Sequence, residues 1–458
     1  MKTLTTLLVL TSLSLTTVVS AETLTPQQQL IQTRACIGCD LEDADLQNIN
    51  LEGVNLEQAN LHNANLQGAN LKNSNLQGAN LQDAQLINAQ LDGINLSGVN
   101  LVNAQLDGVN LSGVNLEGVN LVHAHMDGII LTNANLQGAQ MRGVSLEKAN
   151  LNGANLQGAD FTAHDGERAN LKGINLEGAN LSGAYLRGVH MGEANLKGAN
   201  LSNTDFSQDY PGNPTVSAAL TAVTAAMPFG IPMGLPGGIT GLLNGNPILT
   251  TALGVGVVGG NPIASGTVSA IAAPLPFGIP SGVIGIIGDT IISELSAINS
   301  DLSYANLEGA NLENAHLQDV NLQNANLQNA NLKNANLHFA YLLETNLNHA
   351  DLTSARLTEI NMEGADLSYA NLTGANLNLS YLVRANLNHA NLTSAQLTEI
   401  DMSGADLSDA NLSDANLELS YLVGANLSRA NLASAKLTEV NMSEVDLTNV
   451  DLSQALVR

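Results

Sequence analysis

The sequence predicts an all-β solenoid, in which short extended segments wind into coils that stack on one another. Two observations predict this fold. An apolar residue recurs every five positions from Leu41 to Phe206, and again from Leu302 to Leu452. Aromatic residues make up only 3% of the 458 residues and Trp is absent, although compact cores of this size usually contain many aromatic rings. A period of five matches neither a strand nor a helix, so each unit combines an extended side with a corner.

Each five-residue unit, or pentad, repeats one pattern around its central residue i. Leu occupies position i in 28 of 34 pentads of the first array and in 28 of 31 pentads of the second. A small residue stands at i−2, Asn or Asp usually at i−1, and polar residues or Gly at i+1 and i+2, as in Gln67-Gly68-Ala69-Asn70-Leu71. The small residue and Leu share the buried side, and the remaining pair forms the corner. Stacking then buries the apolar column and pairs the backbones of neighbouring coils.

Asn predominates over Asp at position i−1, and stacking explains this preference. Equivalent residues of successive coils lie above one another, where Asn side chains can hydrogen-bond along the column and Asp carboxylates would repel each other. We therefore expect ladders of Asn side chains along the outside of the coils.

Tandem Ala-Asn-Leu triplets, as at 59–61 and 79–81, resemble the pentapeptide-repeat family. The resemblance covers about 70% of the chain and implies a right-handed, four-sided β-solenoid with four pentads in each coil. Residues 341–380, 381–420 and 421–458 are near-copies of one another. Because 40 residues equal two such coils, this duplication preserves the stacking register.

Residues 1–21 are predicted to be a secretory signal peptide. Lys2 supplies the positive charge, an apolar stretch follows, and Val19-Ser20-Ala21 offers small residues for cleavage before Glu22. Thr and Ser interrupt the apolar stretch, which falls short of the ~20 apolar residues that a membrane span needs. We therefore expect an exported protein, located in the periplasm, the thylakoid lumen or outside the cell.

Residues 22–40 are predicted to cap the first coil. Thr25-Pro26 is typical of a helix start, and we expect a helix over 26–35. Cys36 and Cys39 fall at core-facing positions of the repeat register, where an oxidising compartment would join them in a disulfide. A redox motif is the alternative, but the βαβ surroundings of such motifs are missing. The Cys-x-Gly-Cys-Asp-Leu start resembles exported pentapeptide-repeat proteins of photosynthetic bacteria.

The segment 207–301 interrupts the repeat. Residues 210–288 contain no charged side chain, and 213–232 aligns with 261–280 as an internal duplication. One interpretation is a linker or partner-binding segment of low complexity. The other is contact with a membrane through 210–288, because so many uncharged apolar residues are unusual on a soluble surface, although prolines interrupt every candidate span.

The interruption leaves the relation between the two arrays, 41–206 and 302–458, open. Phe206 and Leu302 are 96 residues apart, which is not a multiple of five. The arrays are therefore either separate rods or one rod with an extruded insert. Apolar residues at helical spacing predict a capping helix near 283–298.

Residues able to carry chemistry are sparse. His123 and His125 with Asp127 are the best metal candidate, but a third strong ligand is missing. The irregular pentad 164–168 is interpreted as a bulge, because the register resumes directly after it. Catalytic triads, phosphate-binding loops and paired carboxylates are not found. We assign no catalytic, cofactor-binding or metal-binding residue and predict a protein that is not an enzyme.

One corner of the second array predicts a partner-binding face. Apolar residues fill its outward positions i+2, i−1 and i+1 in every second coil, and the coils between them carry acidic residues at i+2, namely Glu359, Glu399 and Glu439. Apolar rows should thus recur about every 10 Å and suit a basic, apolar protein surface or a sugar chain. Alternatively, the tyrosines only pack on neighbouring coils. We call this set the tyrosine face; its members are Phe339, Tyr341, Leu343, Leu379, Tyr381, Val383, Leu419, Tyr421 and Val423.

The function that these features predict is a non-enzymatic exported scaffold that binds a macromolecule, expected to be a protein, through a face of the solenoid. The net charge of −26 disfavours nucleic acid as a partner. One alternative is an acidic DNA-mimicking protein that protects topoisomerases, as some acidic members of the family do, although that target is cytoplasmic. Another is a membrane-tethered structural element acting through 210–288.

Overall fold

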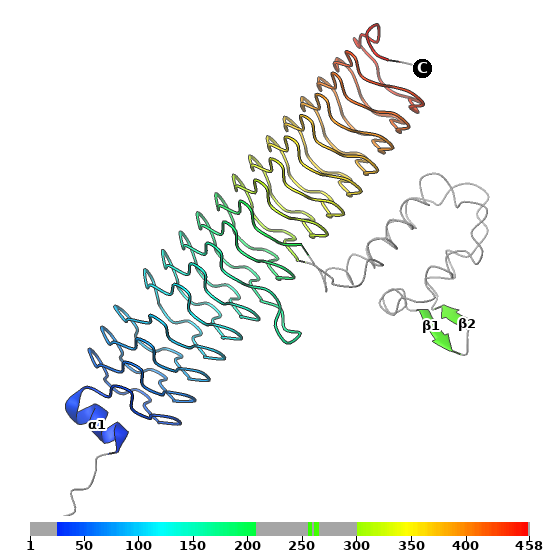
Figure 1. The fold of residues 1–458 in the computed structure, drawn as a ribbon. Coiled ribbons are helices and arrows are strands. Elements are labelled where there is room, and N and C mark those ends of the chain that lie inside the picture. The colour runs from blue at the N-terminus through cyan, green and yellow to red at the C-terminus, as the bar shows by residue number, and fades with distance from the viewer. Residues whose placement is uncertain (1–24, 208–254, 259–260, 265–299, 457–458) are drawn as a thin grey trace, which may run out of the picture.

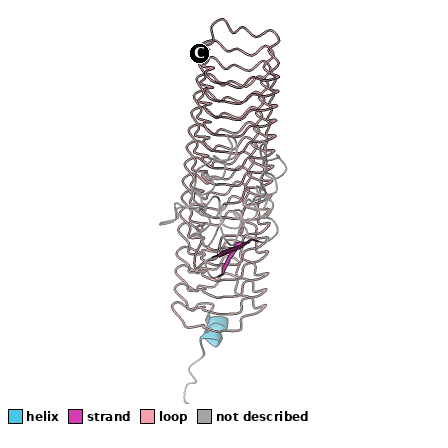
Figure 2. Cartoon of the chain, turned by 90° about the vertical axis from the view of Figure 1, so that its right-hand side faces the viewer, coloured by secondary structure: helices cyan, strands magenta, loops and turns pink. Residues whose placement is uncertain are grey.

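The computed structural model describes residues 25–207, 255–258, 261–264 and 300–456. The pentads form a long rod of stacked coils (Figure 1), and a view turned by 90° shows the same regular stack (Figure 2). Neighbouring coils pair in parallel through residues 20 positions apart, such as Asn60 with Asn80, so each coil contains four pentads. Each coil side contributes a single bridged residue, because the corners occupy most of a pentad. The sides are therefore shorter than the regular strands of an ordinary all-β protein.

The interior of the rod is the predicted column of Leu and Ala. Leu61 and Ala64 have no exposed surface, and nearly all residues at positions i and i−2 are buried. Three backbone hydrogen bonds per pentad join the coils. The N–H of Leu61 donates to the Asn80 carbonyl (2.8 Å), the N–H of Asn63 donates to the Gln82 carbonyl (2.9 Å), and the N–H of Asn80 donates to the Ala59 carbonyl (3.0 Å). Burial of each Leu contributes about 1.5–3 kcal/mol, and the regular ladder satisfies the backbone around it.

The corners explain the residues at position i+2. The N–H of Ala69 donates to the Leu66 carbonyl (3.0 Å), which closes a turn over Gln67 and Gly68. Gly68 has φ 67° and Asn63, at the equivalent place of the preceding pentad, has φ 55°. Gly adopts this left-handed conformation without strain, and Asn tolerates it better than most residues.

The predicted Asn ladders are confirmed. Asn80 Nδ2 donates to Asn60 Oδ1 (3.2 Å), and Asn100 Nδ2 donates to Asn80 Oδ1 (3.0 Å). The same Asn80 oxygen accepts the backbone N–H of Gln82 (3.3 Å). The side chain of Asn80 therefore bonds both to the preceding coil and to the backbone of its own corner, so it stabilises the coil as well as lining the outer surface.

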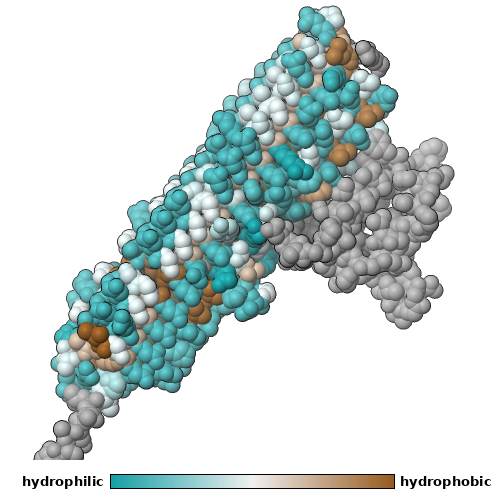
Figure 3. Space-filling model, in the orientation of Figure 1, coloured by the Kyte–Doolittle hydropathy of each residue, from teal (hydrophilic) through white to brown (hydrophobic). Residues whose placement is uncertain are grey.

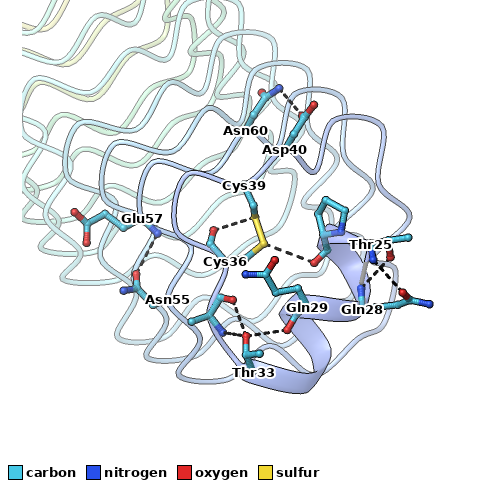
Figure 4. Close-up of a disulfide and its surroundings, with 12 residues drawn as sticks. Thr25, Gln28, Gln29, Thr33, Cys36, Cys39, Asp40, Asn55, Glu57 and Asn60 are labelled. Carbon is cyan, nitrogen blue, oxygen red and sulfur yellow. Dashed lines mark hydrogen bonds between the residues drawn. A yellow bond between two sulfur atoms is a disulfide. The ribbon is translucent and has the colours of Figure 1, made fainter. Parts of the chain in front are cut away.

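Helix α1, Pro26–Thr33, covers the first coil with the buried side chain of Leu30. A capping box starts it: the Gln28 N–H donates to Thr25 Oγ1 (3.2 Å), and the Thr25 N–H donates to Gln28 Oε1 (3.0 Å). The helix ends two residues earlier than predicted, at a left-handed Arg34. A disulfide joins Cys36 to Cys39 directly after it, with Cys36 fully buried (Figure 4).

The irregular pentad is extruded from the coil. Before this pentad, paired residues of neighbouring coils are 20 positions apart. Across it, Ser145 pairs with Asn170, a separation of 25. His164 and Glu167 face each other in a small hairpin, with N–H to carbonyl hydrogen bonds of 2.9 and 2.8 Å in the two directions. We call residues 163–167 the hairpin loop. The predicted bulge is confirmed, and Gly166 lies outside the Leu column.

The two arrays form one rod. His190 pairs with Asp301 and Asp205 with His316, in the same parallel manner as coils elsewhere. The partner separation is 111 residues instead of 20, so 91 residues leave the rod at this junction. The question that the spacing of Phe206 and Leu302 left open is answered in favour of a single rod with an extruded insert.

The side chain of Ser300 links the segment where the chain leaves the rod to the segment where it returns. Its buried hydroxyl accepts the N–H of Gly188 (2.9 Å) and lies within hydrogen-bond distance of the carbonyl oxygens of Leu186 (3.0 Å) and Phe206 (2.9 Å). In the preceding pentad the equivalent N–H, of Gly183, donates to the Ser202 carbonyl of the next coil. The hydroxyl of Ser300 therefore replaces a backbone acceptor at the place where the chain departs.

Within the insert, the structure describes strands β1, Val255–Val258, and β2, Asn261–Ala264. They pair antiparallel with Val255 opposite Ala264. The predicted signal peptide 1–21, the capping helix near 283–298 and most of the uncharged segment 210–288 lie outside the described residues. In the described part of the chain, every helix is too short or too polar to cross a membrane.

Candidate interaction surface

The tyrosine face follows one column of the rod. Tyr341, Tyr381 and Tyr421 alternate in this column with Asn361 and Asp401, each paired with the next in parallel. The tyrosines therefore lie two coils apart, which is the spacing that the 40-residue duplication predicts.

Aliphatic side chains form the exposed part of this face. Leu379 and Leu419 are each 41% exposed, at turn positions with φ 62°. Glu359 and Glu399 occupy the same turn position in the intervening coils, so acidic and apolar side chains alternate along the corner. The side of the rod drawn in Figure 3 is mainly hydrophilic, with separate apolar patches.

The tyrosines lie against the rod. All three are partly buried, and the hydroxyl of Tyr341 is closed off from solvent. Burial, followed by the negative charge of Asp319, raises the pKa of Tyr341 above its ordinary value. Burial raises the pKa of Tyr381 to about 12, with smaller contributions from Asp401 and Glu359. The ring of Tyr341 thus packs against the rod, and Leu379 and Leu419 are the accessible apolar side chains of the face.

A serine before each of the two later tyrosines shapes this corner. Ser380 Oγ donates to the Leu357 carbonyl (2.7 Å) and accepts the N–H of Ile360 (3.2 Å). The hydroxyl therefore lies between the Ile360 N–H and the Leu357 carbonyl. In other corners the equivalent N–H donates directly to the equivalent carbonyl, as from Ala365 to Met362. The corresponding Ser420 donates to the Leu397 carbonyl (2.6 Å). The hydroxyl therefore anchors the tyrosine coil to the corner of the preceding coil.

Asp319 occupies the turn position one coil before Phe339. Burial raises its pKa to about 6. The native protein therefore binds more protons than the unfolded chain between about pH 4 and 6, and this group makes stability fall as the pH rises through that range.

We expect Asp319→Asn to stabilise the protein at pH 7.5 by up to about 3 kcal/mol, because it removes a buried charge. Most of the gain should be lost near pH 4, where the carboxyl group is protonated in the native state and about half protonated in the unfolded chain. Denaturant unfolding of variant and parent at the two pH values measures the difference. Equal stabilities at pH 7.5 would contradict the prediction.

The histidine candidates of the first array do not converge as a set. His125 is exposed and pairs with Gln105 and Ser145 in its own column. Asp127 Oδ1 accepts the Ser145 hydroxyl (2.6 Å) and the N–H of Glu147 (2.9 Å), so it is engaged in the coil. His123 turns instead toward the hairpin loop.

One surface feature was missed from the sequence. The ring of Tyr369 stacks between His349 and His389, with centroid distances of 4.9 and 4.8 Å. Tyr369 is half exposed and all three residues have positive φ. Their 20-residue spacing is the signal that would have found them, once the length of the coil was applied to the exposed turn positions.

Four pentads per coil, a Leu column and external Asn ladders define a solenoid scaffold built from pentads. The chain matches the family model described as pentapeptide repeats (8 copies) over residues 39–163, 169–208 and 300–454. The protein belongs to the pentapeptide-repeat family. The unmatched residues 164–168 include most of the hairpin loop, in agreement with its extrusion from the coil.

Solved structures of the family are similar to this chain. HetL, a protein involved in heterocyst differentiation regulation from the cyanobacterium Nostoc sp. strain PCC 7120, is 24% identical, with 69% of this chain and 89% of HetL covered and a TM-score of 0.28. A pentapeptide repeat protein from the Arabidopsis thaliana thylakoid lumen is 26% identical, with coverages of 30% and 90% and a TM-score of 0.15. QnrB1, a plasmid-mediated fluoroquinolone resistance protein, is 20% identical, with coverages of 35% and 80% and a TM-score of 0.25. No curated protein matches the sequence.

Proposed function

We propose that this protein is an exported, non-enzymatic scaffold whose solenoid binds a protein partner through the tyrosine face. The proposal includes the right-handed sense of the coil, cleavage after Ala21 and a location outside the cytoplasm. A rod with a filled Leu column offers its surface for binding, and family members with this architecture are in general interaction scaffolds.

The alternation of apolar and acidic side chains along one corner is the observation that carries the proposal. Leu379 and Leu419 are accessible at 41% each, and the Glu residues of the intervening coils lie between them. Aliphatic anchors flanked by carboxylates fit a partner segment that presents apolar and basic side chains at matching intervals.

We expect the double variant Leu379→Asp and Leu419→Asp to lose partner binding by at least tenfold, because each change puts a charge where an apolar contact is made. Both residues are at exposed turn positions, so the melting temperature should change by only a few degrees. A pull-down from the exported compartment, followed by affinity measurement on the captured protein, tests this.

The matched control is Ser394→Asp with Ser434→Asp. These residues are exposed at the same turn position of another corner, with φ 58° and 59°, and the control adds the same charge. Partner binding that falls equally in both double variants would be a general charge effect. Binding unchanged in the leucine variant would remove the tyrosine face from the proposal.

The net charge of −26 favours a second candidate, an acidic mimic of DNA that binds a topoisomerase. The two candidates differ in location, because that target is cytoplasmic. Fractionation of the native host separates them: recovery of the protein from the exported compartment supports the scaffold, and recovery from the cytoplasm supports the mimic.

A further inference from the structure

The hairpin loop brings three chemically active side chains to His123, two coils away along the rod. The loop interrupts the coil at the corner whose preceding layers contain His123 and Gly143. His164 and Glu167 face each other across the hairpin, and its two backbone hydrogen bonds fix them as a pair. The single extruded pentad of the described solenoid is thus also the place where two imidazoles and two carboxylates meet.

The ligand atoms of this cluster lie close together. One nitrogen or oxygen each from His123, His164 and Asp165 lie within 4.8 Å of one another. Glu167 Oε2 is 3.0 Å from His123 Nδ1, and the His123 and His164 rings stack with centroids 5.2 Å apart. Ligand atoms around a tetrahedral ion are about 3.4 Å apart. Rotation of the more exposed His164 and Asp165 side chains would cover the remaining distance.

His123 is held in place for this role by the next coil. A Cβ on Gly143 would lie 2.6 Å from His123 Nδ1 and 2.8 Å from its Cε1, so the ring occupies the space that a side chain would take. His123 Nδ1 is buried and makes no hydrogen bond of normal geometry, although the Glu167 carboxylate is beside it. A buried ring nitrogen needs a partner for its lone pair, and a metal ion can fill that place as well as a proton can.

The charges of the cluster also suit a cation. The carboxylates of Asp165 and Glu167 lie 3.8 and 3.0 Å from imidazole nitrogens, and both are exposed. The nearby Arg168 directs its guanidinium to the carbonyl oxygens of Gly188 and Val189, on the next coil. Two neutral imidazoles and two carboxylates carry a charge of −2, which one divalent ion balances.

We propose that His123, His164, Asp165 and Glu167 form a binding site for a divalent transition-metal ion, with Zn²⁺ as the best match. Imidazole combined with carboxylate is a ligand set that zinc accepts in tetrahedral geometry, whereas Mg²⁺ and Ca²⁺ prefer oxygen ligands alone. The bound ion would fasten the hairpin loop to the side of the rod.

Calorimetric titration of the chain from Glu22 onward with ZnCl₂ tests this site. We expect one Zn²⁺ per chain, no binding of Mg²⁺, and affinity reduced by about tenfold or more in His123→Ala and in His164→Ala. The matched control is His125→Ala, which removes an exposed imidazole two residues from His123 and should leave binding unchanged.

Deletion of residues 163–167 provides a second variant that keeps the fold. It joins Thr162 to Arg168 and places Phe161 and Leu171 one pentad apart, so the coil regains the regular register. This variant should melt cooperatively and bind no zinc. Zinc binding by the deletion variant, unchanged zinc affinity in His164→Ala, or loss of binding in His125→Ala would overturn the assignment.

Discussion

Leu71→Asp is expected to unfold the coil around residue 71 and to destabilise the rod by several kcal/mol. Leu71 has no exposed surface, and its side chain is one layer of the continuous apolar column. A carboxylate placed there finds no cation and no water, and an unpaired buried charge costs several kcal/mol or takes up a proton. The matched control is Leu71→Met, since Met126 and Met141 occupy the same position elsewhere and such a swap costs less than about 1.5 kcal/mol.

Hydrogen exchange measures how far this damage spreads. Each coil contacts only its neighbours, so protection should be lost in the coils next to residue 71 and retained in the array beyond the junction. Uniform loss of protection from residue 300 to 456 would show that the rod unfolds as one unit and would contradict local unfolding.

Ser300→Ala is expected to destabilise the junction between the arrays by about 1–3 kcal/mol, because it removes the acceptor of the buried Gly188 N–H. The hydroxyl also lies 2.9 Å from the Phe206 carbonyl and 3.0 Å from that of Leu186. We expect thermal unfolding to lose cooperativity between the two arrays, visible as a broadened or double transition in calorimetry.

Ser74→Ala is the matched control for this change. Ser74 is buried at the same pentad position, but its hydroxyl only donates to the Leu71 carbonyl (2.6 Å), a group that the Ser74 N–H also contacts (3.1 Å). Ala is the usual residue at this position, so the control should be nearly neutral. Equal destabilisation by both substitutions would assign the effect to any lost buried hydroxyl and not to the junction.

Much of the fold could be predicted because one pentad determines its own local structure. The apolar column, the corners and the Asn ladders all follow from residue types at fixed positions, and helix α1 follows from its capping residues. The stacking of the two arrays could not be predicted. The spacing of Phe206 and Leu302 carries no information on whether the chain returns to the same rod, and a serine hydroxyl at the junction gives no periodic signal.

The surface was harder to predict than the core. The repeat register gives the column of each side chain, but not whether a ring projects or lies flat, and Tyr341 is largely covered by its surroundings. Contacts of an irregular loop are harder still. His123 and His164 are 41 residues apart, and only the extrusion of the hairpin loop brings them together, with ring centroids at 5.2 Å.

The junction also makes the rod an acceptor site for protein engineering. The chain leaves and re-enters at neighbouring points, since Ser300 Oγ lies 2.9 Å from the Phe206 carbonyl oxygen, and the 91 residues in excess of the regular repeat do not disturb the stack. A foreign domain whose own termini are close together can be grafted between these points and displayed at mid-rod. Adding whole coils on either side of the junction would then change the distance of the grafted domain from each end of the rod in steps of about 4.8 Å.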